Sequence, residues 1–150
     1  MITTERTNSD NPAFQHLAGE LEMELKIRDG EDHLFYAQLN KIDKLEHVIV
    51  AYSGNEPVGC GGLRSYSQDL MEVKRMYVAP GRRMQGIASL VLKELESWCK
   101  ELMYKKCILE TGKNQPEAIH FYKKNGYISI PNFGHYTNAA NSLCFEKEMI

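Results

Sequence analysis

Long hydrophobic runs, closely spaced cysteines and net charge are all scarce in this sequence. No apolar stretch approaches the roughly 18 residues of a membrane span, and the opening residues, MITTERTNSDNP, lack the apolar core of a signal peptide. The four cysteines include no C-x-x-C pair, so we expect free thiols in a reduced, cytoplasmic protein. The net charge of -2 gives no general attraction to nucleic acid or to a membrane surface. A partner must therefore be recognised through a defined site.

The remaining composition is typical of one globular domain. The chain has 150 residues, of which 43% are hydrophobic and 25% are charged. No repeat, low-complexity tract or Pro/Gly-rich linker divides it, so we expect a single domain over residues 1–150. His16, His33, His47 and His120 show no metal-ligand spacing, and we expect no metal site.

Helical and strand patterns alternate along the chain and indicate a mixed α/β fold. The glycines at 59, 61 and 62 predict a bulge or the close approach of another group. Strand, helix and strand follow one another between residues 70 and 111, which predicts a right-handed βαβ unit with parallel strands. The expected helices cover residues 12–25, 34–45, 86–102 and 115–124, and the expected strands cover residues 2–6, 47–52, 58–66, 70–78, 105–111 and 142–149.

The segment RRMQGIAS, at residues 82–89, has the properties of an anion-binding site. It lies where a strand ends and a long helix begins, so backbone N–H groups without helical partners point outward at the positive end of the helix dipole. Gly86 leaves the backbone open, and Arg82 and Arg83 add positive charge. We interpret the segment as a phosphate or pyrophosphate site, with an ordinary helix start and two solvated arginines as the alternative.

Two common phosphate-binding motifs do not fit this segment. Gly81 and Gly86 have the spacing of a P-loop, but Ile87 and Ala88 stand where that motif has Lys and Ser or Thr. The dinucleotide pattern G-x-G-x-x-G is also absent, and Glu110 comes too late to serve as its acidic partner. We therefore expect neither an NTPase nor a dinucleotide-binding protein.

Two motifs resemble the GNAT family of N-acetyltransferases. The first is R-x-x-G-x-A at residues 83–88, which is similar to the acetyl-CoA signature of that family, Q/R-x-x-G-x-G/A, with Ala88 in place of the commoner glycine. The second is NQPEAIHFYKKNGY, which resembles a later family motif through Asn114, Ala118, Tyr122, Gly126 and Tyr127. The resemblance implies a mixed α+β GNAT fold: a mostly antiparallel sheet of about 6–7 strands, flanked by about 4 helices, with one parallel βαβ unit at the cofactor site.

The resemblance also implies an activity and a cofactor. The expected reaction transfers an acetyl group from acetyl-CoA to an amine by direct attack in a ternary complex, without a metal. Backbone groups of residues 76–78 should pair with pantetheine, and backbone N–H groups of residues 84–89 should hold the pyrophosphate. Asn114 is expected to bond the pantetheine arm or to cap the helix that follows it. The cofactor-binding residues implied in this way are Met76, Tyr77, Val78, Arg83, Met84, Gln85, Gly86, Ile87, Ala88, Ser89, Asn114 and Tyr122.

Two residues are candidates for catalysis. An amine with a pKa of ~10.4 arrives protonated at neutral pH, so a base must remove a proton before it attacks. Glu72 lies on the strand expected to line the cleft, where lysine-acetylating family members carry a glutamate; the alternatives are a solvent-facing glutamate paired with Lys74 or Arg64, or another base or water. The resemblance makes Tyr122 the proton donor to the CoA sulfur, and ordinary core packing is its alternative.

The acceptor is expected to be a small molecule with a primary amine. Protein acetylation at a lysine or an N-terminus is one alternative and would need an open groove; a non-catalytic acyl-CoA-binding sensor is another. No base is evident beside Cys60 or Cys144, so an acetyl-enzyme is not expected. The resemblance further suggests a homodimer. The residues expected to bind the acceptor are Phe35, Tyr36, Arg64, Phe133, His135 and Tyr136.

Overall fold

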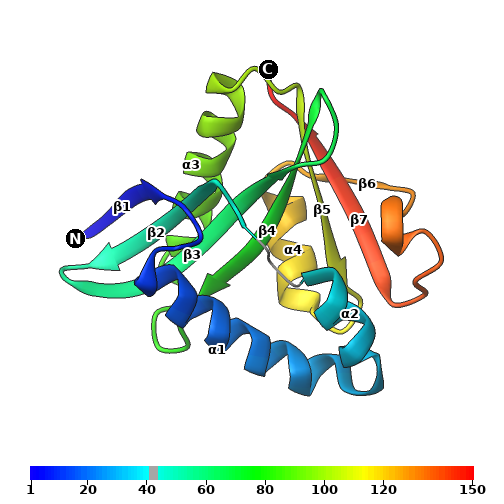
Figure 1. Ribbon diagram of the computed structural model, residues 1–150, viewed down its shortest axis with the longest axis horizontal. Coiled ribbons are helices and arrows are strands. Elements are labelled where there is room, and N and C mark those ends of the chain that lie inside the picture. The colour runs from blue at the N-terminus through cyan, green and yellow to red at the C-terminus, as the bar shows by residue number, and fades with distance from the viewer. Residues whose placement is uncertain (41–43) are drawn as a thin grey trace.

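One mixed sheet organises the chain, as Figure 1 shows. The structure is a computed structural model and describes residues 1–40 and 44–150. The strands of this described part follow the order β1-β2-β3-β4-β5-β7-β6, and only β4 and β5 run parallel. They are β1 (Ile2–Thr7), β2 (His47–Ser53), β3 (Glu56–Ser65), β4 (Leu70–Val78), β5 (Lys106–Gly112), β6 (Ile128–Ile130) and β7 (Ser142–Glu148). This is the mixed, mostly antiparallel sheet expected from the sequence.

Helices cover both faces of this sheet. Helices α1 (Pro12–Asp29) and α2 (His33–Asn40) lie on one face, whereas α3 (Ile87–Glu101) and α4 (Pro116–Lys124) lie on the other (Figure 1). Two short 3-10 helices, η1 (Gly30–Asp32) and η2 (Gly134–Tyr136), follow α1 and precede β7. None of the helices within residues 1–40 and 44–150 is both long and apolar enough to cross a membrane.

The start of α1 is fixed by its N-cap. The Asn11 side chain accepts hydrogen bonds from the backbone N–H groups of Ala13 (2.8 Å) and Phe14 (3.1 Å), and Pro12 occupies the first turn. Phe14 and Leu17 are buried against the sheet. The start predicted from the sequence is therefore confirmed.

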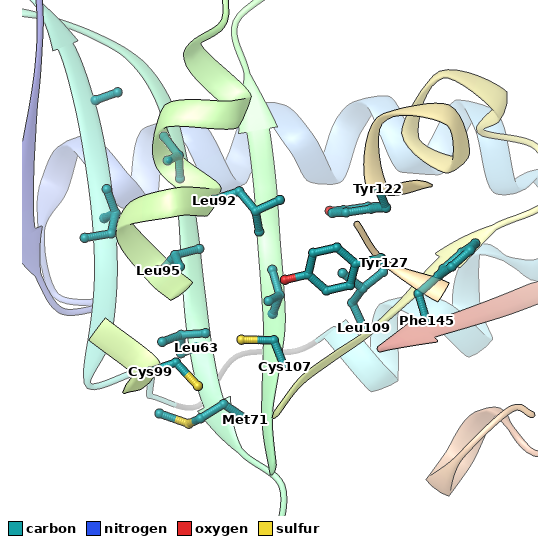
Figure 2. Packing of buried hydrophobic residues seen from close by; sticks show 14 of the residues in the cluster. Leu63, Met71, Leu92, Leu95, Cys99, Cys107, Leu109, Tyr122, Tyr127 and Phe145 are labelled. Atoms are coloured by element: carbon teal, nitrogen blue, oxygen red, sulfur yellow. The ribbon is translucent and has the colours of Figure 1, made fainter. Parts of the chain in front are cut away.

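Among the described elements, helix α3 contributes the largest number of buried residues to the main hydrophobic core. Its residues Val91, Leu92 and Leu95 are completely buried, and burial of each side chain contributes about 1.5–3 kcal/mol. Figure 2 shows Leu92 and Leu95 on the inner side of α3, facing a cluster that includes Leu109 of β5. The predicted amphipathic helix and the βαβ unit around it are both confirmed.

The glycines of β3 permit both features that the sequence suggested. A Cβ on Gly61 would lie 2.5 Å from Met76 Sδ and 2.9 Å from Leu95 Cδ1, so only glycine lets α3 approach this closely. The pairing of β3 with β4 also shifts register between Cys60 and Gly62. This bulge increases the local bend of β4, where Arg75 takes a positive φ of 58°.

Two elements differ from the expectation. A helix is predicted over residues 34–45. The structure describes it over His33–Asn40, residues 41–43 lie outside the described part of the chain, and residues 44–46 are not helical. Leu45 is instead held by Ser9, with a bond from the Leu45 N–H to Ser9 Oγ (2.8 Å) and one from the Ser9 N–H to the Leu45 carbonyl (2.8 Å). Strand β6 was not predicted, because three residues are too short to show an alternating pattern.

Candidate functional site

The site lies where β4 and β5 separate. These parallel strands pair only from Leu70 to Glu72 on β4, although β4 continues to Val78 and β5 to Gly112. Figure 1 shows the two strands diverging, with α4 visible between them. A pocket of about 110 Å³ occupies this divergence. It is lined by Leu21, Leu25, Asp29, Tyr36, Glu72, Val73, Lys74, Arg75, Met76, Glu110, Thr111, Gly112, Gln115, Ala118, Tyr122 and Tyr136.

The pocket brings together some of the residues expected from the sequence and leaves others outside. Both catalytic candidates, Glu72 and Tyr122, line it, as do Tyr36, Met76 and Tyr136. The remaining candidates lie beyond its lining: Phe35, Arg64, Tyr77, Val78, residues 83–89, Asn114, Phe133 and His135.

The start of α3 is open to an incoming anion. Gly86 precedes the helix with a φ of 80° in the left-handed region, and no side chain caps the first turn. A Cβ on Gly86 would meet no atom within 4 Å, so the space beside its backbone is empty of protein. Met84 is fully exposed beside it. The local geometry thus fits a phosphate held by backbone N–H groups.

The two arginines of this segment are partly exposed, and each forms an ion pair that the sequence did not predict. Arg83 binds Glu24 of α1 (Nη2 to Oε2, 2.7 Å), and its Nε donates to the Val78 carbonyl (2.9 Å). Arg82 binds Glu56 in the same way (2.6 Å). Sequence periodicity alone could not show these partners, because they come from elements that are distant along the chain.

Six polar side chains share one region of the pocket, which we term the polar end. They come from several elements and influence one another electrostatically: Asp29, Tyr36, Glu72, Lys74, Glu110 and Tyr136.

Glu72 and Lys74 form a buried ion pair at the polar end. Lys74 Nζ lies 3.6 Å from Glu72 Oε2, and the two residues are each 7% exposed. Burial raises the pKa of Glu72, and the positive charge of Lys74 opposes that rise. Burial likewise lowers the pKa of Lys74. The pairing with Lys74 considered from the sequence is therefore correct, but the carboxylate faces the pocket and not the solvent, and Arg64 lies exposed on the adjacent strand.

Glu110 is a pocket carboxylate that was not among the site residues predicted from the sequence. Its Oε2 accepts a hydrogen bond from Ser142 Oγ (2.7 Å), and Ser142 Oγ lies 2.8 Å from the Tyr36 hydroxyl. Burial raises the pKa of Glu110 to about 7. Its signal in the sequence is a glutamate near the end of an apolar strand, a position that was interpreted only as a possible acidic partner of the dinucleotide pattern.

Tyr122 belongs both to the pocket and to the core. Core packing and the expected role as a proton donor are therefore compatible. It is 7% exposed, and its ring makes edge contacts with Phe121 (5.1 Å between centroids) and Tyr127 (5.8 Å). Figure 2 shows the ring extending from α4 beside Tyr127. Burial raises the pKa of the phenol, so it is protonated at neutral pH.

Asn114 does not cap α4, contrary to one expectation. The N-cap is Gln115, whereas the Asn114 amide donates to the Arg28 carbonyl (3.4 Å) at the end of α1. Arg28 also binds Glu117 of α4 through an ion pair. The segment before α4 is therefore tied to α1.

The loop before β7 closes one side of the pocket. Tyr36 and Tyr136 are buried together with Cys144, and Phe133 packs against them. The Asn132 amide lies within hydrogen-bond distance of two loop carbonyls and of the Ser142 carbonyl, which ties the loop to the start of β7. The other candidates for the acceptor site are exposed: Phe35, Arg64 and His135.

Comparisons with known proteins agree with this architecture. The Acetyltransferase (GNAT) family model matches residues 10–127. The chain is 32% identical to an IAA acetyltransferase of Azospirillum brasilense over 67% of each chain, and 31% identical to the uncharacterized N-acetyltransferase YjgM of Escherichia coli over 83% of this chain and 80% of the relative.

Solved structures show the same fold. A Klebsiella pneumoniae protein assigned as an acyl-CoA N-acyltransferase has a TM-score of 0.84 and 25% identity, covering 100% of this chain and 99% of its own. A GNAT family acetyltransferase from Elizabethkingia anophelis, solved with acetyl-CoA bound, has a TM-score of 0.70 at 22% identity, covering 98% and 97% of the two chains.

Proposed function

This chain belongs to the acetyltransferase (GNAT) family, and on that basis we propose that it transfers an acetyl group from acetyl-CoA to the primary amine of a small molecule. The observation that carries the proposal is the pocket of about 110 Å³ between the diverging strands. Its lining includes the groups that acyl transfer to an amine requires, a carboxylate to take a proton and a protonated phenol to give one.

The placement of acetyl-CoA follows from the open backbone. We expect its pyrophosphate at the N–H groups of residues 84–89, where Gly86 leaves space and no side chain caps α3. We expect the pantetheine arm along residues 76–78, because β4 has no pairing with β5 beyond Glu72 and can accept an added strand. Arg83 would orient this segment through Glu24 and the Val78 carbonyl.

Within the pocket, two proton transfers accompany the reaction. A carboxylate of the polar end removes a proton from the amine; Glu72 is the candidate that the sequence indicates, and Glu110 lines the same pocket. Tyr122 gives its proton to the departing sulfur, since burial keeps the phenol protonated. The thioester supplies the acetyl group, and direct attack by the amine needs no covalent enzyme intermediate.

A small acceptor fits the pocket better than a protein does. Tyr36 and Tyr136 wall the polar end, whereas a protein substrate would need an open groove. A sensor without activity would not need a buried carboxylate, a partly buried one and a buried phenol around one cavity. The four cysteines are free and buried, which suits a reducing compartment such as the cytoplasm. A homodimer stays a prediction.

The test is an acetyl-transfer assay with paired acceptors. Purified protein is given acetyl-CoA with either a panel of small primary amines or lysine-containing peptides, and released CoA thiol is measured. We expect turnover with small amines and none with peptides. Turnover with peptides alone would show that the acceptor is a protein and not a small molecule. Acetyl-CoA binding without any turnover would favour the non-catalytic sensor.

A further inference from the structure

A chain of two short hydrogen bonds joins three elements at the polar end. Tyr36 of α2 lies 2.8 Å from Ser142 Oγ at the start of β7, and Ser142 donates to Glu110 Oε2 of β5 at 2.7 Å. Ser142 is only 3% exposed, while Tyr36 and Glu110 line the pocket. Each hydroxyl carries one proton, so Ser142 donates to the carboxylate and accepts from Tyr36.

The two pocket glutamates differ in their partners. Glu72 lies beside a buried cation, Lys74, which favours its charged form. Glu110 has Ser142 on one oxygen, and its other oxygen, Oε1, accepts no hydrogen bond from the residues that the structure describes. Glu110 thus combines a fixed orientation with an oxygen that, among the described residues, has no donor and can accept from an incoming N–H group.

Resting on the acetyl transfer proposed above, we propose that Glu110 receives the proton of the acceptor ammonium, and that Ser142 and Tyr36 are positioning residues that hold its carboxylate. One N–H bond of the ammonium breaks and its proton goes to Glu110. The nitrogen lone pair then attacks the thioester carbon, the C–N bond forms, and the C–S bond breaks with its electron pair left on sulfur. Tyr122 protonates the sulfur and recovers a proton from the nitrogen, and Glu110 later releases its proton to solvent.

The surroundings of Glu110 set the pH at which it can act. Burial raises its pKa to about 7, while the Ser142 hydrogen bond and the charge of Lys74 oppose that rise. A base works best when its pKa lies near the working pH, so an ionised Glu110 is available just above neutrality. The ionisable groups that face it are Asp29 from α1, Tyr36 from α2, Glu72 and Lys74 from β4, Tyr122 from α4, Tyr136 from η2 and Cys144 from β7.

The kinetic test compares the pH dependence of kcat/KM in four variants, with a small amine that the wild type acetylates. Because the Ser142 bond lowers the pKa of Glu110, Ser142→Ala should move the acidic limb to higher pH by about one unit. Glu110→Gln should lower kcat/KM by about 100-fold and remove that limb. Glu72→Gln should keep the limb, at the same or a slightly lower pH, because the Glu72 charge raises the pKa of Glu110. Ser129→Ala, an exposed serine change on β6, is the matched control and should shift nothing.

The outcomes separate this inference from the proposed function. Two kinetic outcomes would overturn the role of Glu110 while leaving the proposed acetyltransferase activity intact. One is an acidic limb that does not shift in Ser142→Ala, and the other is a limb that is lost in Glu72→Gln but kept in Glu110→Gln. If no amine is acetylated, the function fails, and infrared spectra still test the carboxyl group. A protonated-carboxyl band that titrates near pH 7, shifts upward in Ser142→Ala and is absent in Glu110→Gln supports the assignment; a band unaffected by Glu110→Gln overturns it.

Discussion

At the start of α3 the site is built from the backbone of a few consecutive residues, whereas its polar end is built from side chains that several elements contribute. The α3 segment needs only a glycine with a φ of 80° and a helix without a side-chain cap. The polar end forms only where Tyr36 and Glu110, which are far apart along the chain, both come within hydrogen-bond distance of Ser142 behind them. The first can therefore be recognised as a motif, and the second exists only once the sheet has formed.

The largest expected effect tests the backbone region. Gly86→Glu forces an L-residue into the left-handed region, at a cost of roughly 1–2 kcal/mol, and places a carboxylate where we expect the pyrophosphate. Acetyl-CoA should bind about 100-fold more weakly by calorimetry. Gly81→Glu is the control, because Gly81 also faces open space but has no positive φ. Equal losses in the two variants would show that charge near the loop, and not the Gly86 backbone, decides binding.

A second prediction separates catalysis from cofactor binding at Tyr122. Tyr122→Phe keeps the ring that packs against Phe121 and Tyr127 but removes the proton donor. We expect kcat to fall by about 100-fold while the Kd of acetyl-CoA changes less than about twofold. Tyr104→Phe is matched to it, since the Tyr104 hydroxyl bonds Ser65 outside the pocket. A parallel loss of acetyl-CoA affinity would assign the Tyr122 hydroxyl to binding.

The same contrast explains what the sequence could and could not predict. The start of α1 at Pro12, the helix α3 and the open glycine at 86 depend on a few neighbouring residues, so the sequence could predict them. The same distinction between local and tertiary contacts applies to the candidate site residues. The family resemblance indicated Glu72 as a candidate, but nothing along the chain indicated Glu110, because only the pairing of β5 with β7 brings Ser142 near it.

A third prediction concerns the cost of the polar end to the fold. The folded pKa of Glu110, about 7, lies above its ordinary value of 4.5, so the folded chain binds more protons between these values and loses stability as the pH rises through them. Glutamine resembles the protonated acid and lacks this penalty. Glu110→Gln should therefore match the wild type near pH 4.5 and exceed its unfolding free energy by about 1–3 kcal/mol at pH 8.

Chemical denaturation at the two pH values measures this difference, with Glu146→Gln as the control. Glu146 lies on the neighbouring strand, β7, and is paired with Lys106 (3.0 Å), so its removal should give no gain at pH 8. An equal gain in both variants would mean that general charge reduction, and not the burial of Glu110, stabilises the protein. A stabilised but inactive Glu110→Gln would place the polar end among the parts of the molecule that give up stability for function.

The smallest effect is expected for Asn11→Ala, which tests whether the polar end depends on the whole of α1 or only on its last turns. Asn11→Ala removes the two hydrogen bonds that cap the start of α1. Leu25 and Asp29, which line the pocket, lie near the C-terminal end of this helix. The loss should be about 1 kcal/mol of unfolding free energy, with no change in the KM for the amine. The C-terminal part of α1 is held independently by the bonds of Glu24 to Arg83 and of Arg28 to Glu117. A raised KM in Asn11→Ala would show that these ion pairs do not suffice, and that side chains at the polar end are positioned by the helix as one unit.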